Sequence, residues 1–180
     1  QFDDGVNGEK AAINWRVDLQ TRYVAAMKKY GMSKFKNMGN RNLNIEEFRN
    51  NRYLKYGRLT KAELFTMATH IGNAENKFRL LNYQTDPATI MKVLEKYLTT
   101  EDMDFIQTNI WDEYENKIKP RLRAKELSAG NPEPEWTVAE PFTFKGKEYR
   151  GGHMPLKYSI KGDGRAATAA VKETIDSLSG

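Results

Sequence analysis

The amino-acid sequence predicts a mainly α-helical chain, a bundle-like array of helices with one small β-hairpin near the C-terminus. Apolar residues recur at the helical period over much of the chain, and helix-capping residues stand where these stretches begin. Aromatic residues alternate on both sides of Lys145-Gly146, which is typical of a hairpin. We divide the chain into an N-terminal basic helix and loop (1–58), a helical core (59–128), and a linker, hairpin and short C-terminal helix (129–180).

The N-terminal part begins with a predicted amphipathic helix over Gly8–Tyr30, which Gly31 ends. Its apolar positions are Ile13, Val17, Val24 and Met27. The asparagine- and glycine-containing stretch Ser33–Asn44 predicts a loop. We expect a shorter helix over Ile45–Tyr56.

The core begins with a T-x-x-E pattern formed by Thr60 and Glu63. In such a capping box the hydroxyl and the carboxylate satisfy free N–H groups at the helix end, so a helix is predicted to start here. Gly72 ends this helix. Asn73 is the predicted N-cap of the next one, which runs through Asn82.

Two further helices follow. Asp86-Pro87 combines a capping side chain with a proline at the first helical position, and predicts a helix that ends near Leu98. Thr99 or Thr100 then caps a long helix with an acidic first turn, which suits the positive end of the helix dipole. We expect Pro120 to kink or interrupt this helix. Its apolar stripe consists of Phe105, Ile106, Ile110, Tyr114 and Ile118.

The C-terminal part opens with a predicted linker, Ser128–Pro134. Two short strands are predicted around Lys145-Gly146, with aromatic residues at Phe142, Phe144 and Tyr149. Gly151-Gly152 predicts a sharp turn that brings Pro155–Tyr158 back against the long helix. A final small helix is expected over Arg165–Leu178.

Composition excludes several kinds of protein. The 180 residues include no cysteine, so the chain has no disulfide framework, no thiolate nucleophile and no cysteine metal site. No apolar run has the length of a membrane-spanning helix. Membrane contact stays open, because an amphipathic helix such as Gly8–Tyr30 can lie on a bilayer. The apolar fraction of 39% predicts an elongated or partner-dependent protein.

The charges are distributed unevenly. Arg16–Arg58 holds eleven Lys or Arg against three acidic residues, whereas Asp86–Asn116 holds eight acidic residues against two lysines. One interpretation is that the two halves attract each other, within the fold or between subunits. The other is a nucleic-acid footprint, because an acid-free basic run carries Tyr30 and Phe35 among its cations. The cations of this run are Lys28, Lys29, Lys34, Lys36 and Arg41.

The sequence contains few residues in patterns typical of catalysis or of metal binding. Its two histidines, His70 and His153, show no metal-binding spacing, and Asp163 is a candidate carboxylate partner for His153. No motif for a nucleophile or a phosphate-binding loop is present. Neighbouring helical side chains point about 100° apart, so adjacent acids do not converge on one substrate atom. We therefore expect solvated faces at Glu46-Glu47, Glu101-Asp102 and Asp112-Glu113. No catalytic residue, cofactor or metal is predicted.

Three segments carry a family resemblance. They read L-T-K-A-E-L-F-T-M-A-T-H-I-G-N-A-E-N-K-F-R-L-L, D-F-I-Q-T-N-I-W-D-E-Y-E-N-K-I-K-P-R-L and E-P-F-T-F-K-G-K-E-Y-R-G-G-H-M-P-L-K-Y, all within Leu59–Tyr158. This order resembles a module of the large polyvalent or internal virion proteins of tailed bacteriophages. The most specific parts are Gly72–Asn76, Trp111-Asp112 and Arg150–Gly152. The family pattern has an aromatic residue after the glycine pair, where this chain has His153-Met154.

The resemblance implies a location in the phage particle and a non-enzymatic role, structural or in genome ejection. We expect a structural or internal virion protein, or a segment of one, that contacts copies of itself and other virion proteins, with DNA as a further candidate partner. The residues expected to define the fold are Thr60, Glu63, Asn73, Asn76, Trp111, Gly151 and Gly152.

Two alternatives stay open. The first is a small nucleic-acid-binding accessory protein that uses the basic Lys28–Arg41 run, for which affinity would fall steeply with salt. The second is an enzyme whose site is completed by a partner chain through His153.

Overall fold

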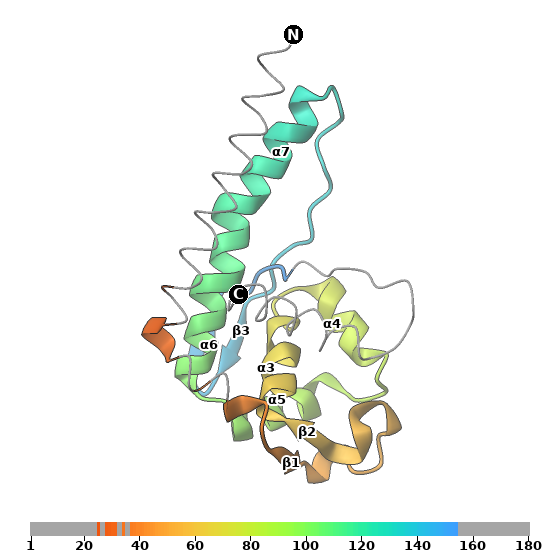
Figure 1. The fold of residues 1–180 in the computed structure, drawn as a ribbon. Helices are drawn as coiled ribbons and strands as arrows, with labels where there is room; N and C mark the ends of the chain where they lie inside the picture. Colours follow the sequence, from red (N-terminus) through yellow and green to blue (C-terminus); the bar gives the residue numbers. More distant parts are fainter. Residues whose placement is uncertain (1–24, 26–27, 32–33, 35–36, 155–180) are drawn as a thin grey trace.

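The computed structural model describes residues 25, 28–31, 34 and 37–154. It confirms a mainly α-helical fold, to which two small antiparallel sheets are added (Figure 1). In chain order the labelled elements are β1 (Asn42–Asn44), η1 (Glu46–Phe48), η2 (Arg52–Gly57), β2 (Arg58–Thr60), α3 (Lys61–Thr69), α4 (Ala74–Leu81), α5 (Pro87–Tyr97), α6 (Thr100–Ile106), η3 (Gln107–Trp111), η4 (Tyr114–Ile118), α7 (Lys119–Ser128), β3 (Phe142–Phe144) and β4 (Lys147–Tyr149). The predictions for Pro155–Tyr158 and Arg165–Leu178, and for most of Gly8–Tyr30, lie outside the described residues.

The predicted capping box at the start of α3 is confirmed. The Glu63 N–H donates to Thr60 Oγ1 at 3.1 Å, and the Thr60 N–H donates to Glu63 Oε2 at 2.7 Å. Each residue thereby satisfies a backbone donor that the first helical turn leaves unpaired.

The other helix starts are confirmed as well. Asn73 caps α4 through the Asn76 N–H, and Asp86 caps α5 through the Thr89 N–H, both at 2.9 Å. For the long helix the cap is Thr99, whose hydroxyl accepts from the backbone N–H of the third helical residue.

The helix that begins at Thr100 continues without a break to Ser128, through α6, η3, η4 and α7. Of the two expected effects of Pro120, a kink or an interruption, the interruption is therefore wrong. Proline lacks an N–H and clashes with the carbonyl group four residues earlier in a regular α-helix. Here a π-helical turn, η4, lies directly before α7, and this wider turn accommodates the ring within the helix.

The C-terminal hairpin is confirmed. Strands β3 and β4 pair Phe142 with Tyr149 and Phe144 with Lys147. The turn residues Lys145 and Gly146 have φ angles of 48° and 78°, the left-handed pair that a two-residue hairpin turn requires.

The predictions for residues 33–56 are wrong in three places. Lys34, Asn37 and Met38 are helical, although Ser33–Asn44 was expected to form a loop. Asn42–Asn44 was expected in a loop and instead forms β1, which pairs with β2. The helix expected over Ile45–Tyr56 is replaced by the two 3₁₀ segments η1 and η2, with left-handed backbone at Lys55 and Tyr56. The Asn51 side chain accepts from two backbone N–H groups at the start of η2, and thus favours a turn over a helix.

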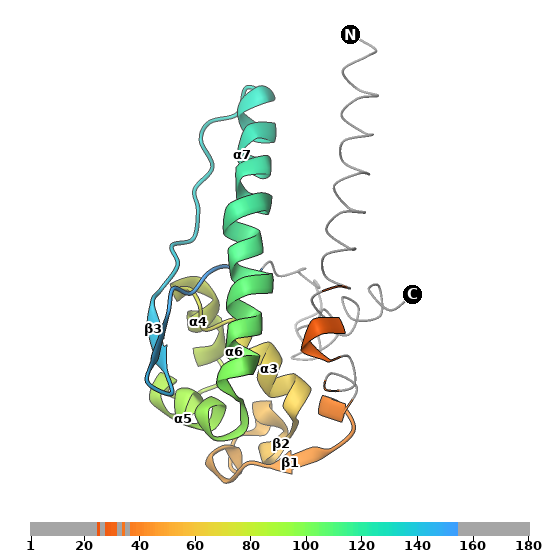
Figure 2. The ribbon, with the colours of Figure 1, turned by 90° about the vertical axis from the view of Figure 1, so that its left-hand side faces the viewer.

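The core surrounds α3, which packs against α5 and α6 (Figures 1 and 2). Its largest fully buried side chains include Trp111, Phe48, Phe144, Ile45, Leu64 and Leu94. Beyond this body the long helix projects away from β1 and β2, and α7 contains no buried residue (Figure 2). We call Lys119–Ser128 the α7 arm.

Candidate functional site

The three most specific segments of the sequence resemblance meet at one place in the fold. Both the Glu140 N–H and the Gly152 N–H donate to the Gly72 carbonyl at 2.8 Å. The Trp111 indole N–H donates to the Thr69 carbonyl at 3.0 Å. We call this meeting point the glycine junction; its residues are Gly72, Asn73, Trp111, Gly151 and Gly152.

The chain segments of the junction lie so close together that only glycine fits at three positions. A Cβ atom on Gly152 would lie 2.3 Å from Trp111 Cβ, and one on Gly72 would lie 2.6 Å from the indole ring. Gly151 has a φ of 74°, and a Cβ there would lie 2.3 Å from the Glu140 carbonyl oxygen. The junction therefore has no space for any side chain at these three positions.

Buried amides complete the junction. Asn73, fully buried, caps α4 with its oxygen and donates from Nδ2 to the Gly152 carbonyl at 2.9 Å. Asn76, also buried, donates to the Met154 carbonyl at 3.2 Å. The predicted fold-defining residues on α4, the long helix and the C-terminal segment are thus brought together, whereas Thr60 and Glu63 cap α3 at its other end.

The sequence analysis missed Gln107. Its amide donates to Asp112 Oδ1 at 2.9 Å and to the Gly151 carbonyl at 3.2 Å, and its oxygen accepts from the Arg150 N–H at 3.0 Å. Arg150 also forms an ion pair with Asp112 at 2.8 Å. The available signal was a polar residue next to the apolar stripe of the long helix, where a buried side chain needs partners.

The two histidines lie in different surroundings: His153 lines a hollow together with Glu115 and Glu135, whereas His70 lies in the core. His70 is buried at the end of α3, and loss of solvation, reinforced by Arg79 and His153, lowers its pKa from 6.5 to about 4. The ring is therefore neutral at pH 7. Burial also lowers the pKa of His153, whose ring packs on Tyr114 with the ring centroids 4.6 Å apart. The candidate partner Asp163 lies outside the described residues.

None of the three adjacent acidic pairs is a fully solvated face, because Glu47, Asp112 and Glu113 are partly buried and Asp102 is fully buried. Asp102 is 1% exposed, completes the cap with Thr99 and lies 3.3 Å from Lys61 Nζ. Burial raises the pKa of this carboxyl group, although the Thr99 N–H and Lys145 oppose the shift. The prediction failed here because the third helical position of a capping box turns back toward the body. Across the described part of the chain, no three metal-binding side chains gather at one point.

The structure describes four of the five predicted nucleic-acid residues, and all four are exposed. Lys28 and Lys29 are exposed, and Arg41 is exposed next to β1. Lys34 forms an ion pair with Glu101 at 2.7 Å, whereas Lys36 is outside the described residues. The pair between Lys34 and Glu101 joins the basic and acidic halves within the fold, as the first interpretation of the charge asymmetry expects.

The α7 arm exposes apolar side chains between cations. Leu122 is 42% exposed and Leu127 is 41% exposed. The cations of the arm and the turn before it are Lys117, Lys119, Arg121, Arg123 and Lys125. Lys117 and Lys119 form ion pairs with Glu113 and Glu115, one helical turn earlier.

Comparisons with protein-family models, with curated proteins and with solved structures find no match to this chain. Among the described helices, none is both long enough and apolar enough to cross a membrane.

Proposed function

We propose that this chain is a non-enzymatic assembly module of a tailed-phage particle, an internal or structural virion protein or a segment of one. The α7 arm carries this proposal. It extends a continuous helix beyond the body and buries none of its own residues, while it exposes two leucines. The two leucines are five residues apart and point about 140° from each other around the helix, so they offer apolar contacts on two sides of the arm.

The charges of the long helix suit pairing with a second copy. Asp112, Glu113 and Glu115 precede α7 and pair with Arg150, Lys117 and Lys119, whereas Arg123 and Lys125 belong to α7. Arg123 pairs with Glu133 within the chain, and this exposed pair can exchange partners on association. Two such helices in antiparallel orientation would each place a basic tip beside the acidic base of the other. A two-fold axis relates the two contacts, so one surface serves both copies.

The glycine junction supports the same role. It fixes the base of the long helix against α4 and the hairpin through buried hydrogen bonds and glycine contacts. A rigid base lets the arm present its leucines in a constant orientation. A helix that is already held in one orientation loses less conformational entropy when it binds a partner, which favours association.

The particle itself provides the test. Quantitative mass spectrometry of purified particles of a phage that encodes this chain is expected to detect the protein before genome release. Loss from emptied particles identifies an ejected internal protein, and retention identifies a fixed structural component. Absence from both preparations would overturn the virion assignment.

A further inference from the structure

A basic hollow is lined by residues of β1, β2 and the segment between them. Strands β1 and β2 lie at the opposite end of the molecule from the tip of the α7 arm (Figures 1 and 2). Its volume is about 590 Å³, within the range of small-ligand sites. Among its lining residues are Asn44, Arg49, Lys55, Tyr56 and Arg58. None of these belongs to the glycine junction or to the arm.

The segment that lines the hollow is packed on the hydrophobic core. Ile45, Phe48 and Leu54 are buried in the core. The Ile45 N–H donates to the Gly57 carbonyl at 2.8 Å, and a Cβ on Gly57 would lie 2.3 Å from the Ile45 carbonyl oxygen. The polar side chains of this segment are therefore presented outward by a packed base.

The outward side combines cations with exposed aromatic residues: Tyr56 lines the hollow, and Tyr53 lies nearby in η2 with the Arg52 guanidinium over its ring. Tyr56 is 65% exposed and Tyr53 is 45% exposed. Lys55 and Tyr56 both have left-handed backbone, with φ angles of 53° and 54°. Such angles cost free energy for residues other than glycine and are concentrated at functional positions. The conformation turns a large aromatic ring toward solvent instead of the core.

The hollow has a surplus of positive charge. Its lining contains three cationic side chains and one carboxylate, Glu46. Arg49 pairs with Glu46 at 3.0 Å and Lys55 with Glu63, but these cations stay largely exposed and can exchange partners. Arg58 makes no ion pair with any described residue. A guanidinium group without a partner is suited to bind a phosphate through two hydrogen bonds.

We propose that this hollow binds a nucleotide unit of a single-stranded nucleic acid. Arg58 and Lys55 would hold the backbone phosphate, the base would stack on Tyr56, and the Asn44 amide would meet the edge of the base. Exposed tyrosines between cations are typical of surfaces that bind single strands with little sequence preference. This surface differs from the predicted Lys28–Arg41 run, and it adds a partner that the arm does not explain.

Fluorescence anisotropy with a labelled twenty-residue oligothymidine tests the inference on the full chain. Binding of the unmodified protein is expected to weaken as salt is raised, because phosphate contacts release counterions. Tyr56→Asn keeps a residue type that tolerates the left-handed backbone, and is expected to weaken binding about tenfold through lost stacking. Arg58→Gln is expected to lower the slope of log affinity against log salt by about 0.7.

Lys125→Gln on the arm and Lys29→Gln on the basic run are the matched controls, and both are expected to bind as the unmodified protein does. Circular dichroism checks that each variant is folded. Absence of binding, or unchanged binding by both Tyr56→Asn and Arg58→Gln, would overturn the inference. Weakening by Lys29→Gln alone would do so too, since it moves the contact to the other surface.

Competition experiments distinguish a nucleotide site from a simple anion site and from a site for an acidic protein. Thymidine monophosphate is expected to displace the oligonucleotide at lower concentration than inorganic phosphate, because only the nucleotide can stack. Equal displacement by phosphate or by polyglutamate would contradict the inference and indicate an anion site or an acidic protein partner. Changes of Leu122 on the arm are expected to leave binding intact, so this result and the assembly proposal fail independently.

Discussion

At Gly152 the C-terminal segment passes so close to the long helix that one methyl group decides the packing. A Cβ there would meet Trp111 Cβ at 2.3 Å. Movement of the C-terminal segment would break the hydrogen bond from the Gly152 N–H to the Gly72 carbonyl, and movement of the helix would break the bond from the Trp111 indole to the Thr69 carbonyl. Gly152→Ala is expected to lower the free energy of unfolding by about 3 kcal/mol, as overpacking of a rigid core does. Denaturant unfolding followed by circular dichroism measures this change.

Gly39→Ala is the control for that prediction. No atom lies within 4 Å of a Cβ built on Gly39. Its free energy of unfolding should change by less than about 0.5 kcal/mol. Equal effects of the two substitutions would show that the close approach to Trp111 does not restrict position 152.

His70 couples stability to pH. Its pKa is about 4 in the folded protein and 6.5 in the unfolded chain, so the unfolded state binds more protons between these values. The stability from the neutral ring is complete above pH 6.5 and is lost as the pH falls toward 4. The difference amounts to about 3 kcal/mol. His70→Gln should show a flatter dependence of unfolding free energy on pH over this range; an unchanged slope would be evidence against the burial argument.

At the scale of elements, the helix caps carry a separable share of the stability. Thr60→Ala removes the hydroxyl group that accepts from the Glu63 N–H, and is expected to cost about 1 kcal/mol. Thr100 is exposed and its hydroxyl caps no helix, so Thr100→Ala serves as the control with an effect near zero. Denaturant midpoints at a constant m-value measure both. A smaller loss for Thr60→Ala than for Thr100→Ala would contradict the role of the capping box.

Elements defined by local chemistry could be predicted from the sequence. The caps at Thr60, Asn73 and Asp86 and the turn at Lys145-Gly146 each depend on residues within four positions of one another. The β1–β2 pairing could not be predicted in this way, because it joins three-residue strands across thirteen intervening residues. Such strands show no period, and only their contact with each other stabilises them.

The glycine junction shows the same division. The sequence singled out Gly151, Gly152 and Trp111 by their residue types. It did not indicate that Gly72 would accept hydrogen bonds from two distant segments, or that Gln107 would bridge Asp112 and Gly151. These contacts depend on how the helices cross, which no local pattern encodes.

On the scale of the whole molecule, the two proposed contact surfaces, the α7 arm and the basic hollow, lie apart from each other. The α7 arm and the strands β1 and β2, which contribute to the lining of the basic hollow, lie at opposite ends of the molecule (Figures 1 and 2). An assembly contact at one end leaves the other end free for a second partner. This arrangement suits a module that packs with its own copies while it holds nucleic acid.

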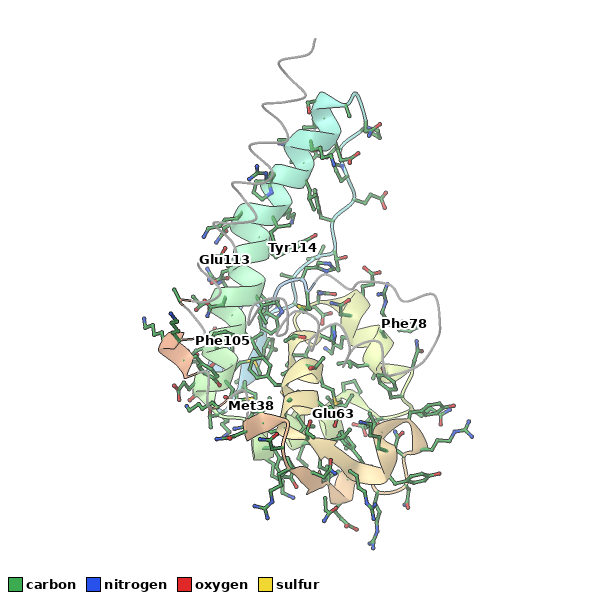
Figure 3. The ribbon with its side chains drawn as sticks, viewed as in Figure 1. Met38, Glu63, Phe78, Phe105, Glu113 and Tyr114 are labelled. Atoms are coloured by element: carbon green, nitrogen blue, oxygen red, sulfur yellow. The ribbon has the colours of Figure 1, made fainter. Side chains whose placement is uncertain are left out.

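Self-association through the α7 arm is the most direct test of the central claim, measured by size-exclusion chromatography with light scattering over a range of protein and salt concentrations. The unmodified protein is expected to form dimers that salt weakens, and the double variant Leu122→Asp, Leu127→Asp to remain monomeric. Phe78→Asp is the matched control, because Phe78 is 65% exposed on α4, away from the arm (Figure 3). A monomer under all conditions, or equal association of the arm variant and the unmodified protein, would contradict the account.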